Sequence, residues 1–234
     1  MSAVRFDLFT IALLTLRDDA PQLDEETAAA LQDSHMTSNA DLHDAGHLLA
    51  AGPLPDARFR GLSVWNVEPG RVRLLREQDP AVHAGRLSAE VLRWMVPDHT
   101  VAFHRTRLPR SVAEVSGGTV QLDRFTVTLL AARPDAPSLD EGGREALQDA
   151  HLAHNADLHE AGHLLTAGPL RHDVLRALGI WSLEPEQVEG HVAADPLVRA
   201  GRLSCTVMPW MVPSGAISFP PGRLPRSRAD AAYE

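Results

Sequence analysis

Cysteine is almost missing from this chain of 234 residues, in which Cys205 is the single example. One cysteine cannot form an intrachain disulfide, so the small disulfide-stabilised folds of secreted proteins are excluded. A chain without disulfides suits a reducing compartment. We therefore expect a cytoplasmic protein.

Long apolar runs are also lacking. The apolar stretch near the N-terminus begins at Phe6, is interrupted by Asp7 and Thr10, and is followed by no small-residue cleavage site, so we expect no signal peptide. No run approaches the length of a membrane-spanning helix. These two observations predict a protein with no membrane partner.

Positive charge is in deficit. The chain has 22 Lys and Arg residues against 31 Asp and Glu residues, a net charge of −9. Binding to a phosphate backbone requires a basic face. We therefore expect no nucleic-acid partner.

The two halves of the chain repeat each other. The segment LQDSHMTSNADLHDAGHLLAAGPL, which contains His35, returns as LQDAHLAHNADLHEAGHLLTAGPL around His151, and this register continues without a gap as far as Ser111 and Ser227. Two copies are too few for a solenoid, so duplication of a domain that once formed a dimer is the simpler interpretation. We expect copies at residues 1–104 and 119–234, joined by a linker at 105–118 that contains proline and a Ser-Gly-Gly turn.

Each copy shows the periodicity of strands and helices in the order β-α-β-β-α-β, the ferredoxin-like pattern. A sheet with helices on one face leaves its other face in need of a partner. The sequence therefore predicts an α+β protein with two tandem ferredoxin-like domains that form an intrachain pseudo-dimeric α/β barrel, with a homodimer of the whole chain left open. In the first copy we expect strands at 6–16, 48–54, 62–67 and 87–97, the last extending towards Phe103, and helices at 24–45, after Pro69 and after Asp79.

Four ordered motifs in each copy resemble the YCII-related (YciI-like) domain. They are a histidine in the first helix, G-H-L-L-x-A-G-P-L, D-P-x-V-x-A-G-R-L and a final W-M-V-P strand. The likeness spans nearly the whole of both copies and implies the dimeric α/β-barrel superfamily, whose members include a dehydrochlorinase, isomerases and cofactor-free monooxygenases. It also implies that His35 with Asp79, and His151 with Asp195, are the catalytic pairs.

A carboxylate beside an imidazole fixes its tautomer and favours its charged form. Such a pair can move a proton near neutral pH. A structural role is open for each residue as well. Asp79 followed by Pro80 is typical of a helix start, and His35 shares a helix face with Leu31 and Leu42, as a core histidine would. Capping and pairing are compatible because a carboxylate has several acceptor sites.

Other residues that recur in both copies are candidates for substrate binding. The planar fork of arginine binds two oxygens of a carboxylate, although exposed arginines and core tryptophans are the more common outcomes. No glycine pattern of a nucleophile elbow surrounds the recurring serines, so a hydrolase triad is not expected. The candidates are Arg60, Arg86, Ser88 and Trp94 in the first copy, and Arg176, Arg202, Ser204 and Trp210 in the second.

Recurring histidines raise the question of a metal site. His35 and His43 are two helical turns apart, about 12 Å along the helix, which is too far for one ion without other elements. We expect His43 on the solvated edge of its helix, and neither a metal nor another cofactor.

These features predict a small enzyme with two equivalent sites, in which a His–Asp dyad performs cofactor-independent acid–base chemistry on a small anionic or phenolic substrate, as a lyase, isomerase or dehydrochlorinase. The alternative is a non-catalytic small-ligand-binding or scaffold protein of the same family. The two hypotheses differ in whether His35 and Asp79 meet at a pocket.

Overall fold

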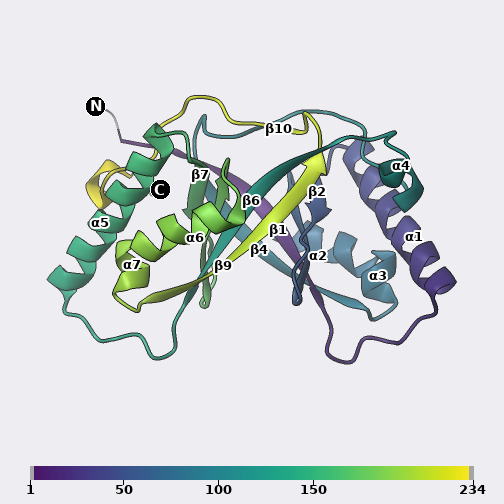
Figure 1. Cartoon of the computed structure of the whole chain (residues 1–234), viewed down its shortest axis with the longest axis horizontal. Helices are drawn as coiled ribbons and strands as arrows, with labels where there is room; N and C mark the ends of the chain where they lie inside the picture. The colour runs from purple at the N-terminus through teal and green to yellow at the C-terminus, as the bar shows by residue number, and fades with distance from the viewer. Residues whose placement is uncertain (1–2, 232–234) are drawn as a thin grey trace.

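The computed structural model describes residues 3–231. Figure 1 shows two similar lobes, with helices on the outer sides and strands between them. Each lobe corresponds to one copy of the repeat and contains one four-stranded sheet. Within the described residues, no helix is long and apolar enough to cross a bilayer.

The first copy has the predicted order of elements. Its antiparallel sheet has the strand order β2-β3-β1-β4. The third strand differs from its predicted boundaries, because it spans Phe59–Trp65 and not 62–67; Phe59 pairs with Thr15 beyond an irregularity in the register. The second strand ends one residue earlier than predicted, at Pro53. The elements are β1 (Phe6–Leu16), α1 (Glu25–Asp44), β2 (Leu48–Pro53), β3 (Phe59–Trp65), α2 (Pro69–Glu77), α3 (Pro80–His83) and β4 (Leu87–Pro97).

The second copy repeats this architecture, with the strand order β7-β8-β6-β9. Its elements are β6 (Leu122–Ala132), α5 (Glu141–Glu160), β7 (Leu164–Pro169), β8 (Leu175–Trp181), α6 (Pro185–Ala194), α7 (Pro196–Arg199) and β9 (Leu203–Pro213).

The ends of the long helix α1 follow from local chemistry. The side chain of Asp24 accepts a hydrogen bond from the backbone N–H of Thr27, which satisfies one of the free donors at the helix start. Gly46 follows the helix with φ +77°, a left-handed conformation that glycine adopts without steric cost. In the second copy, Asp140 caps the start of α5 through the backbone N–H of Gly143, and Gly162 follows its end with φ +75°.

The two sheets share one hydrophobic core. Buried side chains from both copies form a single cluster, with Ile11 and Val64 from the first sheet and Val127 and Ile180 from the second. Edge strand β4 packs against β7, and β9 packs against β2, so the sheets close on each other as a barrel. Because alternate residues of a strand point to opposite faces, the other face of each sheet is left for its own helices, which form two separate clusters with it.

The glycines of the two G-P-L motifs lie where the sheets meet. A Cβ atom added to Gly52 would lie 1.6 Å from the carbonyl oxygen of Met211, and one added to Gly168 would lie 1.6 Å from that of Met95. No side chain can be accommodated at such a distance, so the absence of a Cβ permits this approach of the two backbones.

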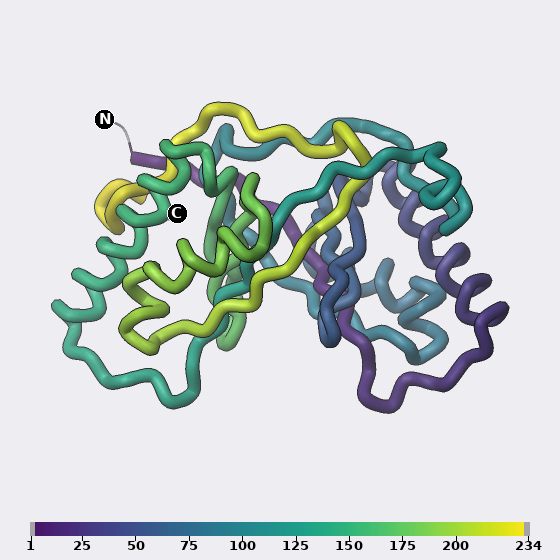
Figure 2. The backbone as a smooth tube through the Cα atoms, in the orientation of Figure 1, coloured from purple at the N-terminus to yellow at the C-terminus, as the bar shows by residue number. Residues whose placement is uncertain are grey.

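The segment that follows the last strand of each copy crosses to the other copy. The prediction that β4 extends towards Phe103 is wrong, because the chain turns after Pro97, where the backbone N–H of Thr100 bonds to the carbonyl of Pro97. A separate strand, β5 (Ala102–Phe103), then pairs with β10 (Ile217–Ser218) of the second copy. Figure 2 shows the two segments meeting along the upper edge of the molecule.

Residues 105–118, predicted as a linker, carry the short helix α4 (Val112–Ser116). Arg110 in this segment forms ion pairs with Asp41 and Asp44 of α1, at 2.6 and 2.9 Å. In the second copy, Arg226 pairs in the same way with α5. The recurring R-L-P-R-S motif therefore attaches each of these segments to the first helix of its own copy.

Candidate active site

The structure brings the two members of each predicted dyad together. The Nδ1 atom of His35 lies 2.8 Å from both carboxylate oxygens of Asp79, and Nδ1 of His151 lies 2.6 Å from Oδ2 of Asp195. The histidine comes from the middle of α1 or α5, and the aspartate from the start of α3 or α7. Each aspartate also caps its helix, because Asp79 accepts the backbone N–H of Ala81.

Both aspartates are buried, at 0% exposure for Asp79 and 5% for Asp195. Burial by itself would raise the pKa of each carboxyl. The hydrogen bond from the histidine is the largest effect that opposes burial, and backbone N–H groups of the following helix add to it, so the pKa of each aspartate lies below its usual value. A carboxylate held in its charged form fixes the proton of the imidazole on Nδ1 and leaves Nε2 as the basic nitrogen.

An asparagine one helical turn after each histidine faces that basic nitrogen. The Nδ2–H of Asn39 donates to Nε2 of His35 at 3.0 Å, and the Nδ2–H of Asn155 donates to Nε2 of His151 at 3.1 Å. Spacing by four residues places the two side chains on the same helix face. The resulting Asp–His–Asn chain is common to both copies.

The surroundings of the first dyad are filled by Arg76. The residue is 1% exposed, and its Nη1 donates to Asp79 at 2.7 Å and to Oδ1 of Asn39 at 2.9 Å. Nη2 donates to Ser63 at 3.1 Å, and the guanidinium lies over the ring of Trp65 at 4.6 Å. Burial lowers the pKa of Arg76, while Asp79 opposes this effect.

The second dyad lies in the wall of a cavity of about 420 Å³. The residue at the position of Arg76 is Val192, which is too short to reach the aspartate and also lines the cavity. The cavity lies between α5 and the helix-facing side of the second sheet, where Thr128 and Trp181 project from β6 and β8. Its volume is within the usual range for small-molecule sites.

The candidate arginines occupy different surroundings in the two copies. Arg176 and Arg202 both line the cavity, and each also donates to a backbone carbonyl, of His172 and Pro137 respectively. Their counterparts Arg60 and Arg86 form the same kind of bond, to the carbonyls of Asp56 and Pro21.

The other candidates lie outside the cavity lining. Trp94 and Trp210 are completely buried in the core between the two sheets, and the indole N–H of Trp210 donates to the carbonyl of Leu62. Ser88 hydrogen-bonds to Thr15 at 2.6 Å, and Ser204 is exposed. None of these four side chains lines the cavity that contains the second dyad.

Arg76, Asn39 and Asn155, which are bonded directly to the members of the dyads, were not predicted. The asparagines recur four residues after each histidine, and this spacing was a usable signal. Arg76 does not recur, since Val192 takes its place. A comparison limited to recurring residues could not find it, whereas a search for differences between the copies would have done so.

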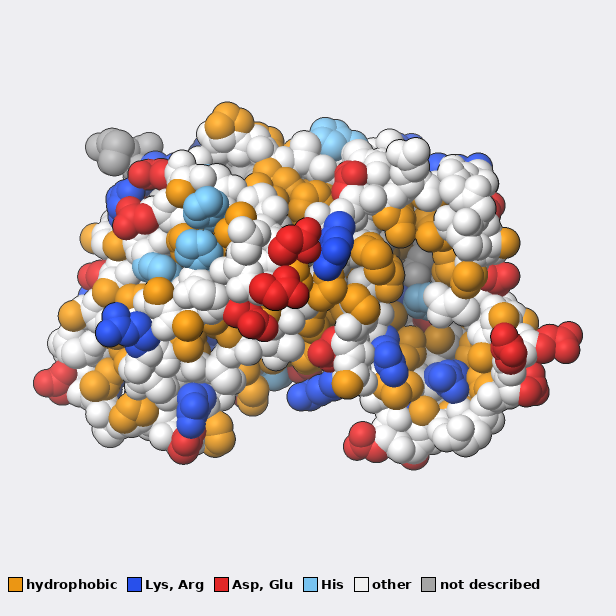
Figure 3. Space-filling view, in the orientation of Figure 1, with side chains coloured by type: hydrophobic (Ala, Val, Ile, Leu, Met, Phe, Trp, Pro, Cys, Tyr) orange, Lys and Arg blue, Asp and Glu red, His pale blue; other side chains and the backbone are white. Residues whose placement is uncertain are grey.

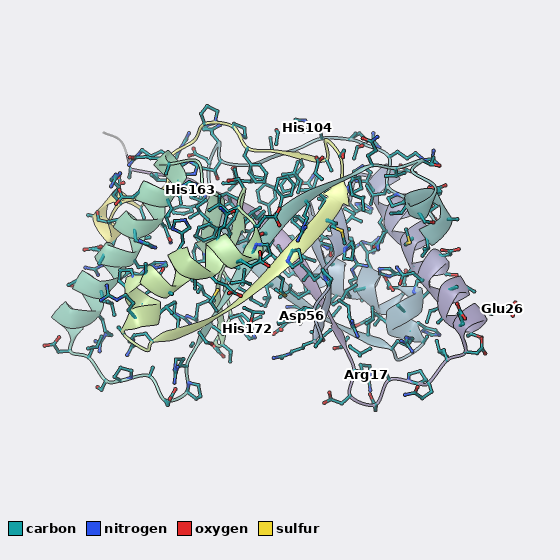
Figure 4. The ribbon with its side chains drawn as sticks, viewed as in Figure 1. Arg17, Glu26, Asp56, His104, His163 and His172 are labelled. Atoms are coloured by element: carbon teal, nitrogen blue, oxygen red, sulfur yellow. The ribbon has the colours of Figure 1, made fainter. Side chains whose placement is uncertain are left out.

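Histidines gather on the outer side of the second copy. The ring of His191 stacks with those of His163 and Trp181, and Nε2 of His154 bonds to the carbonyl of His191. Figure 3 shows histidine side chains on this face of the left lobe, and Figure 4 labels His163 among them. Among residues 3–231, no group of three or more His, Cys, Asp or Glu side chains is arranged to hold a metal ion.

His43 is a correction to the sequence-based expectation. It was expected on a solvated edge, but it is 5% exposed and its Nδ1 lies 2.9 Å from the carbonyl oxygen of Leu48. The turn at Gly46 brings β2 back alongside the end of α1, which buries the ring. The histidine therefore joins the helix to the following strand.

Comparisons with known proteins support the fold. No known family profile matches the sequence, and no curated protein matches it. Among solved structures, a mutant chlorite dismutase from Candidatus Nitrospira defluvii in complex with cyanide is similar, with a TM-score of 0.53 and 14% identity over 88% of this chain and 90% of that one. A heme-binding protein from Thermus thermophilus has a TM-score of 0.50 and 12% identity over 90% of this chain and 94% of that one. The chain therefore has the fold of tandem ferredoxin-like, dimeric α/β-barrel proteins, and the resemblance to the YCII-related family within that fold stays a prediction.

Proposed function

We propose that the protein is a small-molecule enzyme with one working site, in the second copy, where His151 and Asp195 perform acid–base chemistry. The observation that carries the proposal is that both members of this dyad line a cavity, whereas Arg76 is bonded directly to the aspartate of the first dyad. The sequence predicted two equivalent sites, and we propose a single one in their place.

The proposed chemistry is proton transfer through Nε2 of His151. Asp195 holds the proton of the ring on Nδ1, so Nε2 has the lone pair that accepts a proton from a bound substrate. In the first copy, Arg76 fixes the amide of Asn39 through its oxygen. In the second copy, position 192 is a valine, so no arginine at that position fixes the amide of Asn155. The Asn155 amide can therefore turn aside when a substrate approaches Nε2 of His151.

Heme is a possible ligand to test against this site, because one structural neighbour is described as heme-binding. A histidine that binds heme iron must present a free ring nitrogen. Both ring nitrogens of His151 are in hydrogen bonds, and Nε2 of His154 is bonded to a backbone carbonyl. Iron at Nε2 of His151 would have to displace the Asn155 amide, as the substrate of a proton transfer would, and the chemistry proposed here uses no heme.

Proton abstraction can be tested before the natural reaction is known. Candidate ligands are first identified by native mass spectrometry of the purified chain and are then incubated with the protein in D₂O, with deuterium incorporation at C–H positions followed by NMR. We expect incorporation that is abolished by His151→Gln and retained by the matched variant His35→Gln.

The outcome separates the enzyme from the alternative of a non-catalytic binding or scaffold protein. A ligand that binds in the cavity but gains no deuterium and is not converted would support the alternative. Loss of incorporation in His35→Gln, with the fold intact, would show that the first dyad also works and would contradict the single-site proposal.

A further inference from the structure

The first copy contains a binding site for the two terminal nitrogens of a guanidinium group, while the Nε of Arg76 is buried without a hydrogen-bond partner among the described residues. Arg76 supplies that group, and its donors meet three acceptors: the carboxylate of Asp79, the amide oxygen of Asn39 and the hydroxyl of Ser63. The face of the guanidinium lies over Trp65 at 4.6 Å, an arrangement that attracts a cation to the ring. None of these partner residues belongs to the segment Val72–Leu75 that leads to Arg76. The same arrangement of partners could therefore bind the guanidinium of a small molecule.

The second copy keeps these acceptors. Asp79, Asn39 and Trp65 correspond to Asp195, Asn155 and Trp181 at the same register of the repeat. All three counterparts line the 420 Å³ cavity.

The hydroxyl acceptor is also kept, although it comes from a different strand. Ser63 accepts the indole N–H of Trp65 at 2.9 Å. The counterpart of Ser63 is Gly179, which has no hydroxyl. On the neighbouring strand, however, the second copy has Thr128 where the first copy has an alanine, and the Thr128 hydroxyl accepts the indole N–H of Trp181 at 3.0 Å. Because both hydroxyls bind the same indole N–H, they lie at equivalent places, and Thr128 also lines the cavity.

The second copy therefore has the acceptors and the aromatic face, but a valine where the cation would be. Its aspartate is 5% exposed, and a buried carboxylate attracts a cation more strongly than one in water. We propose that the cavity binds a small molecule with a guanidinium head, which takes the position that the Arg76 side chain occupies in the first copy. This inference rests on the proposed function, because it names a ligand that regulates the same site: a guanidinium held there would fix the Asn155 amide over Nε2 of His151 as Arg76 fixes that of Asn39, and would block proton transfer.

The rest of the cavity indicates what the other end of such a molecule carries. Arg176 and Arg202 line the cavity; Arg176 is exposed and Arg202 is half-buried, so they lie towards solvent. Arginine binds a carboxylate through its planar fork. A guanidino acid has both groups, with a cation for Asp195 and a carboxylate for these arginines.

The test uses guanidinoacetate as the probe and ureidoacetate as an isostere that keeps the carboxylate but has an uncharged head, with binding measured by calorimetry on the full chain. We expect guanidinoacetate to bind at least about tenfold more tightly, a difference of about 1.4 kcal/mol. Equal affinity for the two compounds, or no binding of guanidinoacetate, would overturn the proposal.

Val192→Arg should abolish binding of guanidinoacetate, because the new side chain can reach Asp195 as Arg76 reaches Asp79. The matched control is Val174→Arg on the exposed surface, where the native side chain is 53% exposed, and it should bind normally. If Val192→Arg fails to fold, Asp195→Asn provides the second variant, since asparagine caps a helix as well as aspartate does. Tight binding to either folded variant would contradict the proposal.

The two proposals can fail separately. If another ligand gains deuterium in a manner that depends on His151 while guanidinoacetate does not bind, the guanidinium assignment is wrong and the enzyme proposal stands. If guanidinoacetate binds as expected but no ligand gains deuterium or is converted, the site is a binding site and the enzyme proposal fails.

Discussion

Gly52 gives the most direct test of how the two copies are joined. Replacing it with alanine places a Cβ atom 1.6 Å from the carbonyl oxygen of Met211 and 2.7 Å from the carbonyl carbon. Both are backbone atoms of the other copy's sheet, so a rotamer change cannot relieve the clash. Strands β2 and β9 must move apart, which opens the shared core along this edge.

The expected cost is at or above the upper end of ordinary overpacking. Extra methyl groups in a packed core usually cost about 1–3 kcal/mol, and a clash between two backbones belongs at the upper end, so we expect Gly52→Ala to lose about 3 kcal/mol or more. For a chain of this size that loss corresponds to a decrease in Tm of roughly 6–12 °C. Gly168→Ala should cost about the same, since its Cβ would lie 1.6 Å from Met95.

Gly61→Ala is the matched control. It lies on the neighbouring strand of the same sheet, a Cβ there would meet no atom closer than 3.5 Å, and the second copy has alanine at the equivalent position 177. Urea unfolding measures the three variants against the native chain. The reasoning would be refuted if Gly52→Ala unfolded within about 0.5 kcal/mol of Gly61→Ala, which is the scatter of neutral substitutions.

Three further outcomes are expected. Residues 1–110 expressed alone should form a homodimer or aggregate, because half of the shared core would be exposed; a monomer with cooperative unfolding, seen by sedimentation and circular dichroism, would count against this. Burial and two neighbouring histidines lower the pKa of His191 in the folded chain. The unfolded chain therefore protonates His191 more readily than the folded chain, and the stability of the fold decreases as the pH falls below the pKa of this histidine in the unfolded chain. His191→Leu, the residue at the equivalent position 75, should flatten the pH dependence of Tm between about pH 7 and about pH 5, and an unchanged slope would contradict the assignment. Hemin added to the chain should give no Soret shift that depends on His151, and such a shift, lost in His151→Gln, would show that the dyad histidine can bind iron.

Much of the fold could be predicted because it depends on local signals. Asp24 and Gly46 mark the ends of α1 through capping chemistry that involves only adjacent residues. Strand boundaries were less predictable, as at Phe59, because a strand extends as far as its neighbour offers hydrogen-bonding partners. His43 was misplaced for the same reason, since its burial depends on the path of β2 and not on its own helix.

The dyad shows where prediction from the sequence ended. The family resemblance and the helix pattern indicated His35 and Asp79 as partners. They could not indicate Arg76, because its contacts with Asn39 and Ser63 join segments far apart along the chain. The sequence does show that Arg76 is matched by Val192 in the second copy. Only the structure shows that the Arg76 side chain points to Asp79 and that the difference therefore affects the dyad.

By itself, the sequence determined that the chain is duplicated, which elements each copy forms and which charged residues start its helices, since each of these follows from periodicity and from contacts within a few residues. Tertiary structure alone decided that Gly52 and Gly168 lie against the opposite sheet, that the first dyad holds an arginine and that the second lines a cavity. The physical reason is that close packing depends on which atoms meet across the barrel and across the helix–sheet interface. A repeat that is nearly identical in sequence therefore has two chemically different sites.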